Sequence, residues 1–143
     1  MKINVLLILV VVLLLDINVA ASKEVTIDMH KIMMIESSGR NVASNIKSEH
    51  AIGIFQITPI CLKEFNDFHP EAGISMDDLW NASICAHIAY WYINKRIPQL
   101  LRYHNKPVTV KNIIIAYNAG ISYVVHSKPL PKITKKYLRK YFR

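Results

Sequence analysis

Apolar residues recur at helical spacing through the middle of the chain. In the longest such stretch, which begins after Asp77-Asp78 and ends at Pro98, the apolar positions lie three or four residues apart: Trp80, Ile84, Ile88 and Trp91. A helix with this pattern buries one face in a core, and proline stops a helix because its nitrogen has no hydrogen to donate. No run of alternating residues is convincing as a strand. We therefore expect a single, mainly or wholly α-helical domain.

Local signals predict four further helices. Each is marked by a capping side chain, a proline in the first turn or a glycine at the end: one from Thr26 or Asp28 to Ser37 or Gly39, one from Pro59, one from Val108 to Ala119, and one from about Lys132. The stretches 44–50 and 69–75 have no apolar period and are expected to be loops.

The first residues have the pattern of an export signal. Lys2 precedes an uninterrupted apolar run from Val5 to Leu15, and Val19-Ala20-Ala21 places small residues where a signal peptidase reads. We expect residues 1–21 to be a signal peptide and residues 22–143 to be the exported domain, periplasmic or associated with the cell envelope and not inserted in a membrane. A retained membrane anchor is the alternative, but the apolar run is short against the roughly 20 residues that cross a bilayer.

Charge is unevenly distributed along the exported part. Residues 22–78 carry nine acidic and five basic side chains, whereas residues 79–143 carry twelve basic and no acidic ones. A catalytic carboxylate must therefore come from the first half. The basic half suits a polyanionic surface such as a cell-wall polymer or a membrane. Nucleic acid also attracts basic chains, but the export signal argues against it.

Glu36 is the carboxylate that the sequence singles out. It lies at the end of an apolar helical pattern, in the stretch Met33-Met34-Ile35-Glu36-Ser37-Ser38-Gly39, where it is expected to be partly desolvated. Desolvation raises the pKa of a carboxyl group and keeps it protonated near neutrality, as a general acid requires. The alternative is a surface glutamate at a helix end.

Three short motifs follow one another along the chain. They are Glu36-Ser37, then Gly53-x-x-Gln56-Ile57-x-Pro59, and then Ala116-Tyr117-Asn118-Ala119-Gly120. Each is weak alone, but in this order and spacing they resemble the family-1, Slt-type lytic transglycosylases of the lysozyme superfamily, over roughly residues 32–141. Thr134-x-x-Tyr137 resembles the tail of that family's Glu-Thr-x-x-Tyr motif. Ile133 stands where the family has its glutamate, so the contribution of that second acid is missing.

The resemblance implies a mainly α, lysozyme-like (α+β) fold with a groove for peptidoglycan glycan strands. It implies cleavage of the bond between N-acetylmuramic acid and N-acetylglucosamine without water, leaving a 1,6-anhydromuramyl end, with Glu36 as the sole acid and base. Glycosidases with one carboxylate are recognised exceptions to the usual pair. The substrate-binding candidates are polar or aromatic side chains at matching positions: Ser37, Ser44, Gln56, Tyr117 and Asn118. By spacing, Ser48 is the alternative to Ser44.

Two other functions stay open at this point. One is a lysozyme-type hydrolase with the same fold, and the other is a non-catalytic wall-binding or assembly subunit, which the isoleucine at position 133 mildly favours. Small enzymes of this type resemble those that open the wall for a secretion or conjugation apparatus or for phage, so an envelope-spanning apparatus is a candidate partner. No cofactor or metal is expected, because the six histidines are scattered without paired spacing. Cys61 and Cys85 are expected to form either a disulfide or two buried free thiols.

Overall fold

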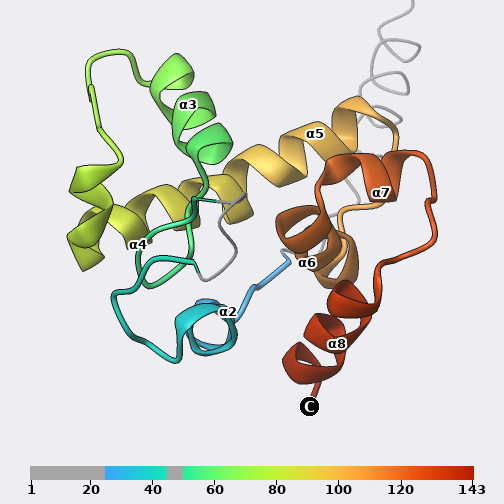
Figure 1. Cartoon of the computed structure of the whole chain (residues 1–143). Helices are drawn as coiled ribbons and strands as arrows, with labels where there is room; N and C mark the ends of the chain where they lie inside the picture. The colour runs from blue at the N-terminus through green and yellow to red at the C-terminus, as the bar shows by residue number, and fades with distance from the viewer. Residues whose placement is uncertain (1–24, 45–49) are drawn as a thin grey trace, which may run out of the picture.

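The computed structural model describes residues 25–44 and 50–143 (Figure 1). Helices dominate, and extended segments in the described ranges pair only through two isolated antiparallel bridges. The mainly helical, lysozyme-like fold expected from the sequence is confirmed. The elements are α2 (Met29–Ser37), α3 (Pro59–Phe68), the 3₁₀ turn η2 (Asp77–Trp80), α4 (Ala82–Trp91), the π-helical turn η3 (Tyr92–Arg96), α5 (Ile97–Tyr103), α6 (Val110–Ala119), α7 (Ile121–Val125) and α8 (Lys132–Tyr141).

The predicted signal peptide, residues 1–21, lies outside the described residues and stays a prediction. So does most of the predicted loop at 44–50, including the alternative Ser48. No helix in the described part of the chain has the length and apolar character needed to cross a membrane.

Side-chain caps fix the starts of the helices. A carboxylate oxygen of Asp28 accepts the backbone N–H of Lys31 at 3.0 Å and begins α2. The hydroxyls of Thr58 and Thr109 cap α3 and α6 in the same way. A cap accepts one of the N–H groups that a helix leaves unpaired at its start. The predicted starts of these helices are therefore confirmed to within one or two residues.

The single long helix predicted between Asp77 and Pro98 is wrong at both ends. The 3₁₀ turn η2 stops at Asn81, whose side chain accepts two backbone N–H groups and begins α4 as a new helix. At the other end α4 continues through η3 into α5, with Pro98 buried in the first turn of α5. The widened π turn offers a reason, because a proline is tolerated where the regular ladder of helical hydrogen bonds is already interrupted.

The α4–η3–α5 rod forms the centre of the core. It contributes fully buried side chains along its whole length, among them Ile88, Ile93, Ile97 and Leu101. Figure 1 shows this rod crossing the molecule, with α3 above it, α2 below it and α6, α7 and α8 gathered at one end. Cys61 and Cys85 are buried free thiols; burial raises the pKa of Cys61 to about 12.

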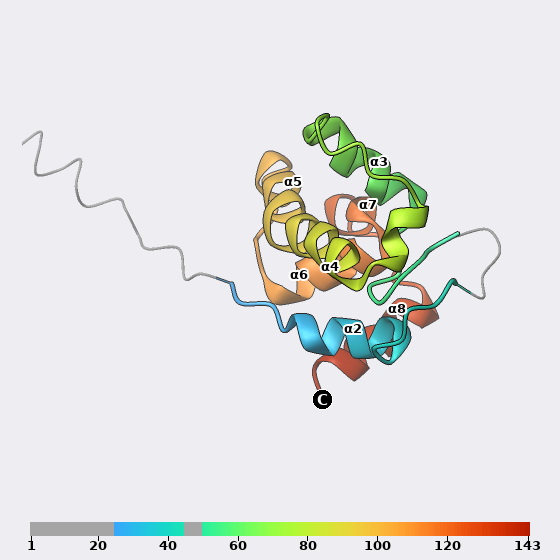
Figure 2. The ribbon, with the colours of Figure 1, turned by 90° about the vertical axis from the view of Figure 1, so that its left-hand side faces the viewer.

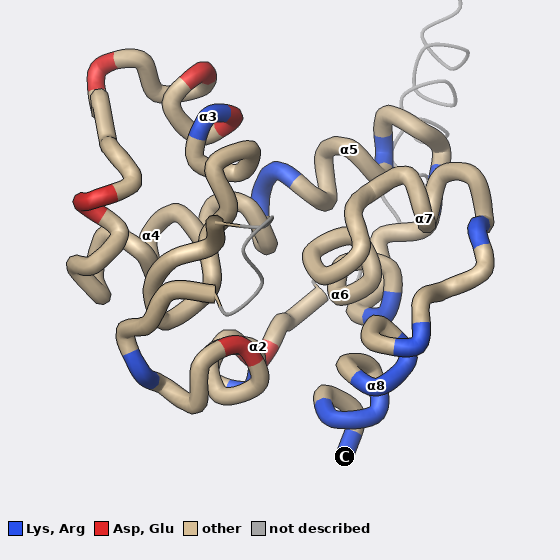
Figure 3. The backbone as a smooth tube through the Cα atoms, in the orientation of Figure 1, with Lys and Arg blue, Asp and Glu red and all other residues tan. Residues whose placement is uncertain are grey.

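Charged side chains are segregated in space as well as in sequence. Figure 3 shows the acidic residues on α2, α3 and the segment that leads to α4, whereas basic residues gather on α6, α8 and the loop that follows α7. Two ion pairs occur within the described ranges, Lys63–Asp67 and Arg96–Glu64. The basic end of the molecule takes part in neither of them.

Candidate active site

Glu36 lies in the last turn of α2 and faces α8. The hydroxyl of Tyr137 donates to Oε1 of Glu36 at 2.8 Å, across 101 residues of sequence. Two further bonds fasten the same helices, from the backbone N–H of Asp28 to the Tyr141 hydroxyl at 2.9 Å and from Lys31 Nζ to the Tyr141 carbonyl at 3.0 Å. Figure 2 shows α2 and α8 packed side by side. The Glu36 carboxylate is thus hydrogen-bonded by a residue of α8, near the other end of the chain.

Ser37 of α2 and Tyr117 of α6 both donate hydrogen bonds to the segment 53–57. The Ser37 hydroxyl donates to the carbonyl of Ile54 at 2.8 Å and to that of Met33 at 3.3 Å. The Tyr117 hydroxyl, on α6, donates to the carbonyl of Phe55 at 2.6 Å. The end of α2, the segment 53–57 and the end of α6 therefore meet beside Glu36.

Gln56 uses its amide nitrogen to hold a turn. Its Nε2 donates to the carbonyls of Val42 and Gly53, each at 2.9 Å, and its own backbone has a positive φ of 52°. Two donated bonds occupy both hydrogens of the amide. In this structure the Gln56 amino group therefore supports the loop, and its contact with a substrate stays a prediction.

The pKa values of Tyr117 and Tyr137 are both raised in this site. Burial is the first cause that raises the pKa of each phenol far above its ordinary value, and the negative charge of Glu36 is the second. Both hydroxyls consequently stay protonated and remain hydrogen-bond donors throughout the range in which an enzyme works.

Asn118 follows Tyr117 and carries an unsatisfied polar atom. Its Oδ1 is buried and has no hydrogen-bond partner in the described part of the chain. An unpaired buried acceptor lowers the stability of the fold. A hydrogen bond from water or from a bound ligand would remove this cost.

Ser44 lies in a different setting. It lines an open pocket of about 510 Å³ together with His50 of the neighbouring loop, Pro59 at the start of α3 and Met76, which precedes η2. Neither Glu36 nor Tyr117 lines this pocket. The structure thus brings Glu36, Ser37, Gln56 and Tyr117 to one place, with Asn118 adjacent in sequence, whereas Ser44 is found in the lining of this pocket. No group of three potential metal ligands gathers within the described ranges.

The sequence profile of the transglycosylase SLT domain matches residues 21–139. The chain belongs to this family. Searches of the curated proteins and of the solved structures find no match. Membership of the SLT family supports a transglycosylase-type activity on peptidoglycan, and therefore peptidoglycan binding and a place of action outside the cytoplasm.

Tyr137 is the member of this SLT site that the sequence candidates left out. The sequence feature that pointed to Tyr137 was the Thr134-x-x-Tyr137 match. In the structure both residues lie on the inner face of α8, where each is almost fully buried. Ile133, at the position of the missing acid, is 62% exposed on the same helix. Finding the role of Tyr137 required knowing that α8 packs against α2.

We expect Tyr137→Phe to lower kcat/KM about tenfold, which corresponds to about 1.4 kcal/mol. A hydrogen bond donated to a carboxylate stabilises its charged form, so losing the bond raises the pKa of Glu36. If Glu36 acts as the acid, the alkaline limb of the pH–rate profile moves to higher pH. Steady-state rates of peptidoglycan cleavage between pH 4 and pH 9 measure both effects.

Tyr141→Phe is the matched control for this prediction. It removes a phenolic oxygen from the same helix, namely the one that accepts the backbone N–H of Asp28. The control should lower the free energy of unfolding and leave the pH profile in place. An unshifted profile in Tyr137→Phe would show that Tyr137 serves α8 packing alone.

Proposed function

We propose that this protein is a lytic transglycosylase in which Glu36 is both the acid and the base. The family supports a transglycosylase-type activity, and the proposal adds the residue and the product. Glu36 protonates the oxygen that leaves C1 of N-acetylmuramic acid as the glycosidic bond breaks. The resulting carboxylate accepts the proton of the C6 hydroxyl while that oxygen bonds to C1. Atoms balance without water, and the product is a 1,6-anhydromuramyl end.

The observation that carries the proposal is the setting of the Glu36 carboxylate, which accepts the Tyr137 hydroxyl at 2.8 Å beside the buried phenol of Tyr117. Among the described residues it is the one carboxylate whose charge acts on Tyr117 and Tyr137, and no acidic side chain follows Asp78 in the chain. Retaining and inverting hydrolases place a second carboxylate about 5 to 9.5 Å from the first. One such carboxylate among the described residues supports a mechanism in which the sugar supplies its own nucleophile.

The other polar groups have supporting roles in this proposal. Tyr137 fixes the position of the carboxylate, and the unpaired Oδ1 of Asn118 accepts a donor from the sugar. Ser37 and Gln56 hold the segment 53–57 in place, and any further contact they make with the glycan belongs to the bound state. Ser44 is proposed to bind the glycan farther along the strand, at the pocket that this residue lines.

The proposed setting is the periplasm or the cell envelope, after removal of residues 1–21. A protein that cleaves glycan strands there can open the wall locally. An envelope-spanning secretion or conjugation apparatus is the proposed partner, because such an assembly requires a local opening in the wall.

The products released from purified peptidoglycan test the proposal. Mass spectrometry of the muropeptides should find anhydromuramyl ends, which are lighter by one water than reducing ends. Reducing ends would identify a lysozyme-type hydrolase. Binding to peptidoglycan without any released product would identify a non-catalytic wall-binding subunit.

A further inference from the structure

A second pocket, of about 400 Å³, lies at the basic end of the molecule. It is formed by α6, α7, the segment that precedes α6 and the loop that follows α7. Its lining includes Lys106, Lys111 and Lys128, together with the polar side chains of Tyr123 and Ser127. None of the residues proposed for transglycosylation lines it, so it is a separate feature of the surface.

None of the acidic side chains that the structure describes forms an ion pair with the lysines of this pocket. Every lining residue comes from the part of the chain after Asp78, which contains no Asp or Glu, and the two ion pairs of the described ranges involve none of its lysines. The contacts recorded for the Lys128 ammonium are with neutral groups, the Ser122 hydroxyl at 3.5 Å and the Tyr123 ring at 5.5 Å from its centroid. Three lysines that line one hollow attract an anion more strongly than the same charges on a flat surface.

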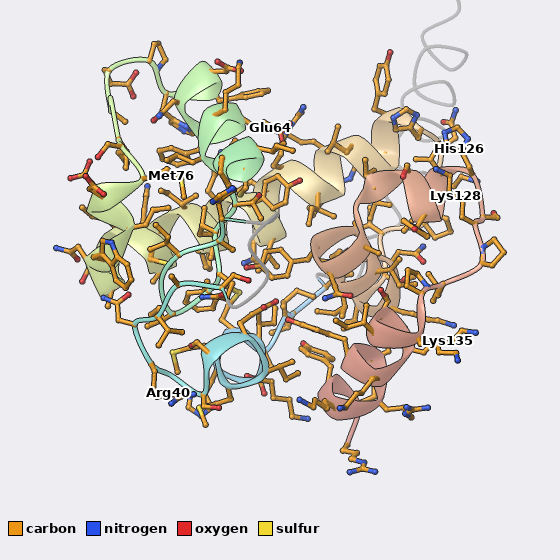
Figure 4. All side chains as sticks on the ribbon, in the orientation of Figure 1. Arg40, Glu64, Met76, His126, Lys128 and Lys135 are labelled. Carbon is orange, nitrogen blue, oxygen red and sulfur yellow. The ribbon has the colours of Figure 1, made fainter. Side chains whose placement is uncertain are left out.

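Backbone hydrogen bonds order two of the segments that line the pocket, the loop after α7 and the segment before α6. The N–H of Lys128 donates to the carbonyl of Tyr123 at 3.1 Å, and the N–H of Lys106 donates to the carbonyl of Leu101 at 2.8 Å. Two of the three lysines therefore have hydrogen-bonded backbone N–H groups, one in the segment before α6 and one in the loop after α7. In Figure 4 Lys128 lies beside α7, on the same side of the view as Lys135 of α8.

The donor set suits a phosphate group. Lysine is a common phosphate ligand, because its ammonium acts as a point charge that can donate to phosphate oxygens from any direction. This pocket is lined by lysines and hydroxyls and by no arginine. Several point donors arranged around a hollow suit the tetrahedral oxygens of a phosphate.

We propose that this pocket binds a phosphate group carried by an anionic polymer or lipid of the cell envelope. The binding is independent of the chemistry at Glu36. It gives the domain a second attachment to its surroundings, through the basic end of the fold, while the candidate active site acts on the glycan.

Titration with inorganic phosphate at constant ionic strength, followed by amide shifts in NMR spectra, tests the site. The shifts should saturate and should centre on Tyr123, Ser127 and Lys128. The triple variant Lys106→Gln/Lys111→Gln/Lys128→Gln should raise Kd by about tenfold or more. The single variant Lys128→Gln is a milder change that tests the same site if the triple variant folds poorly.

The matched control removes the same number of charges from α8, in Lys132→Gln/Lys135→Gln/Lys136→Gln. This control should leave Kd for phosphate within about twofold of the wild-type value. Equal weakening in both variants would overturn the proposal, because it would mean that phosphate responds to net charge and not to the pocket. Shifts that never saturate would overturn it as well.

Further titrations identify the chemistry and its source. Acetate should bind at least about tenfold more weakly than phosphate, and equal affinity would overturn the phosphate assignment. Vesicles of phosphatidylglycerol and a soluble glycerol-phosphate polymer then serve as two larger probes. Loss of vesicle binding in the pocket variant would assign the phosphate to lipid, loss of polymer binding would assign it to a wall polymer, and retention of both would contradict the proposed role.

Discussion

Replacing Glu36 with Gln is expected to lower the rate of peptidoglycan cleavage by at least about 10³-fold, since one positioned acid or base contributes about 10² to 10⁴ and this residue is proposed to serve as both. Gln has the same shape and can still accept the hydrogen bond that Tyr137 donates to Oε1. It cannot transfer a proton to the leaving oxygen. Mass spectrometry of muropeptides, at equal protein concentration and over long incubation, measures the loss.

The control for this prediction is Glu71→Gln, which neutralises an exposed carboxylate outside the site and should leave the rate unchanged. Sedimentation with insoluble peptidoglycan should show that the Glu36→Gln protein still binds. A variant that retains more than about a tenth of wild-type activity would contradict the role of Glu36, because the expected loss corresponds to about 4 kcal/mol of transition-state stabilisation.

The parts of the fold that the sequence predicted well depend on short-range chemistry. Asp28, Thr58 and Thr109 cap their helices through hydrogen bonds to residues three positions on, and such signals lie within one turn of sequence. The continuation of α4 through Pro98 depends instead on a π turn, whose presence no local pattern indicated. The short helix α7 follows Gly120 directly and was also missed.

The residues of the candidate site also fall into those that a short motif indicates and those that only the tertiary structure reveals. Motif order was enough to nominate Glu36 and Tyr117, and the charge of Glu36 contributes, after burial, to the raised pKa of Tyr117. Tyr137 reaches Glu36 only because α8 packs on α2, and a contact across 101 residues leaves no periodic trace in a sequence. The donors of Ser37 and Gln56 are bonded to backbone carbonyls of the segment 53–57 and its neighbours. A tight turn creates such carbonyls, which need partners when buried.

Gly53→Ala is the substitution from which we expect the largest loss of stability, about 3 kcal/mol or more, because it combines steric overlap with backbone strain. An added Cβ would lie 2.6 Å from Cys85 Sγ and 2.7 Å from the Leu79 carbonyl oxygen. The φ of +87° also disfavours any residue with a Cβ. Urea unfolding followed by circular dichroism measures the change in free energy.

Gly73→Ala separates the two causes of that loss. Gly73 also has a positive φ, of 54°, but no atom lies within 4 Å of the position its Cβ would take. This control should cost only about 1 kcal/mol, the strain alone. Cys85→Ala added to Gly53→Ala should relieve only part of the overlap, because the Leu79 carbonyl remains in place. If both glycine variants lost equal stability, the contact with Cys85 and Leu79 would not be the cause of the loss. The close packing of the turn at residue 53 against α4 would then not explain how the segment bound by Ser37 and Tyr117 is positioned.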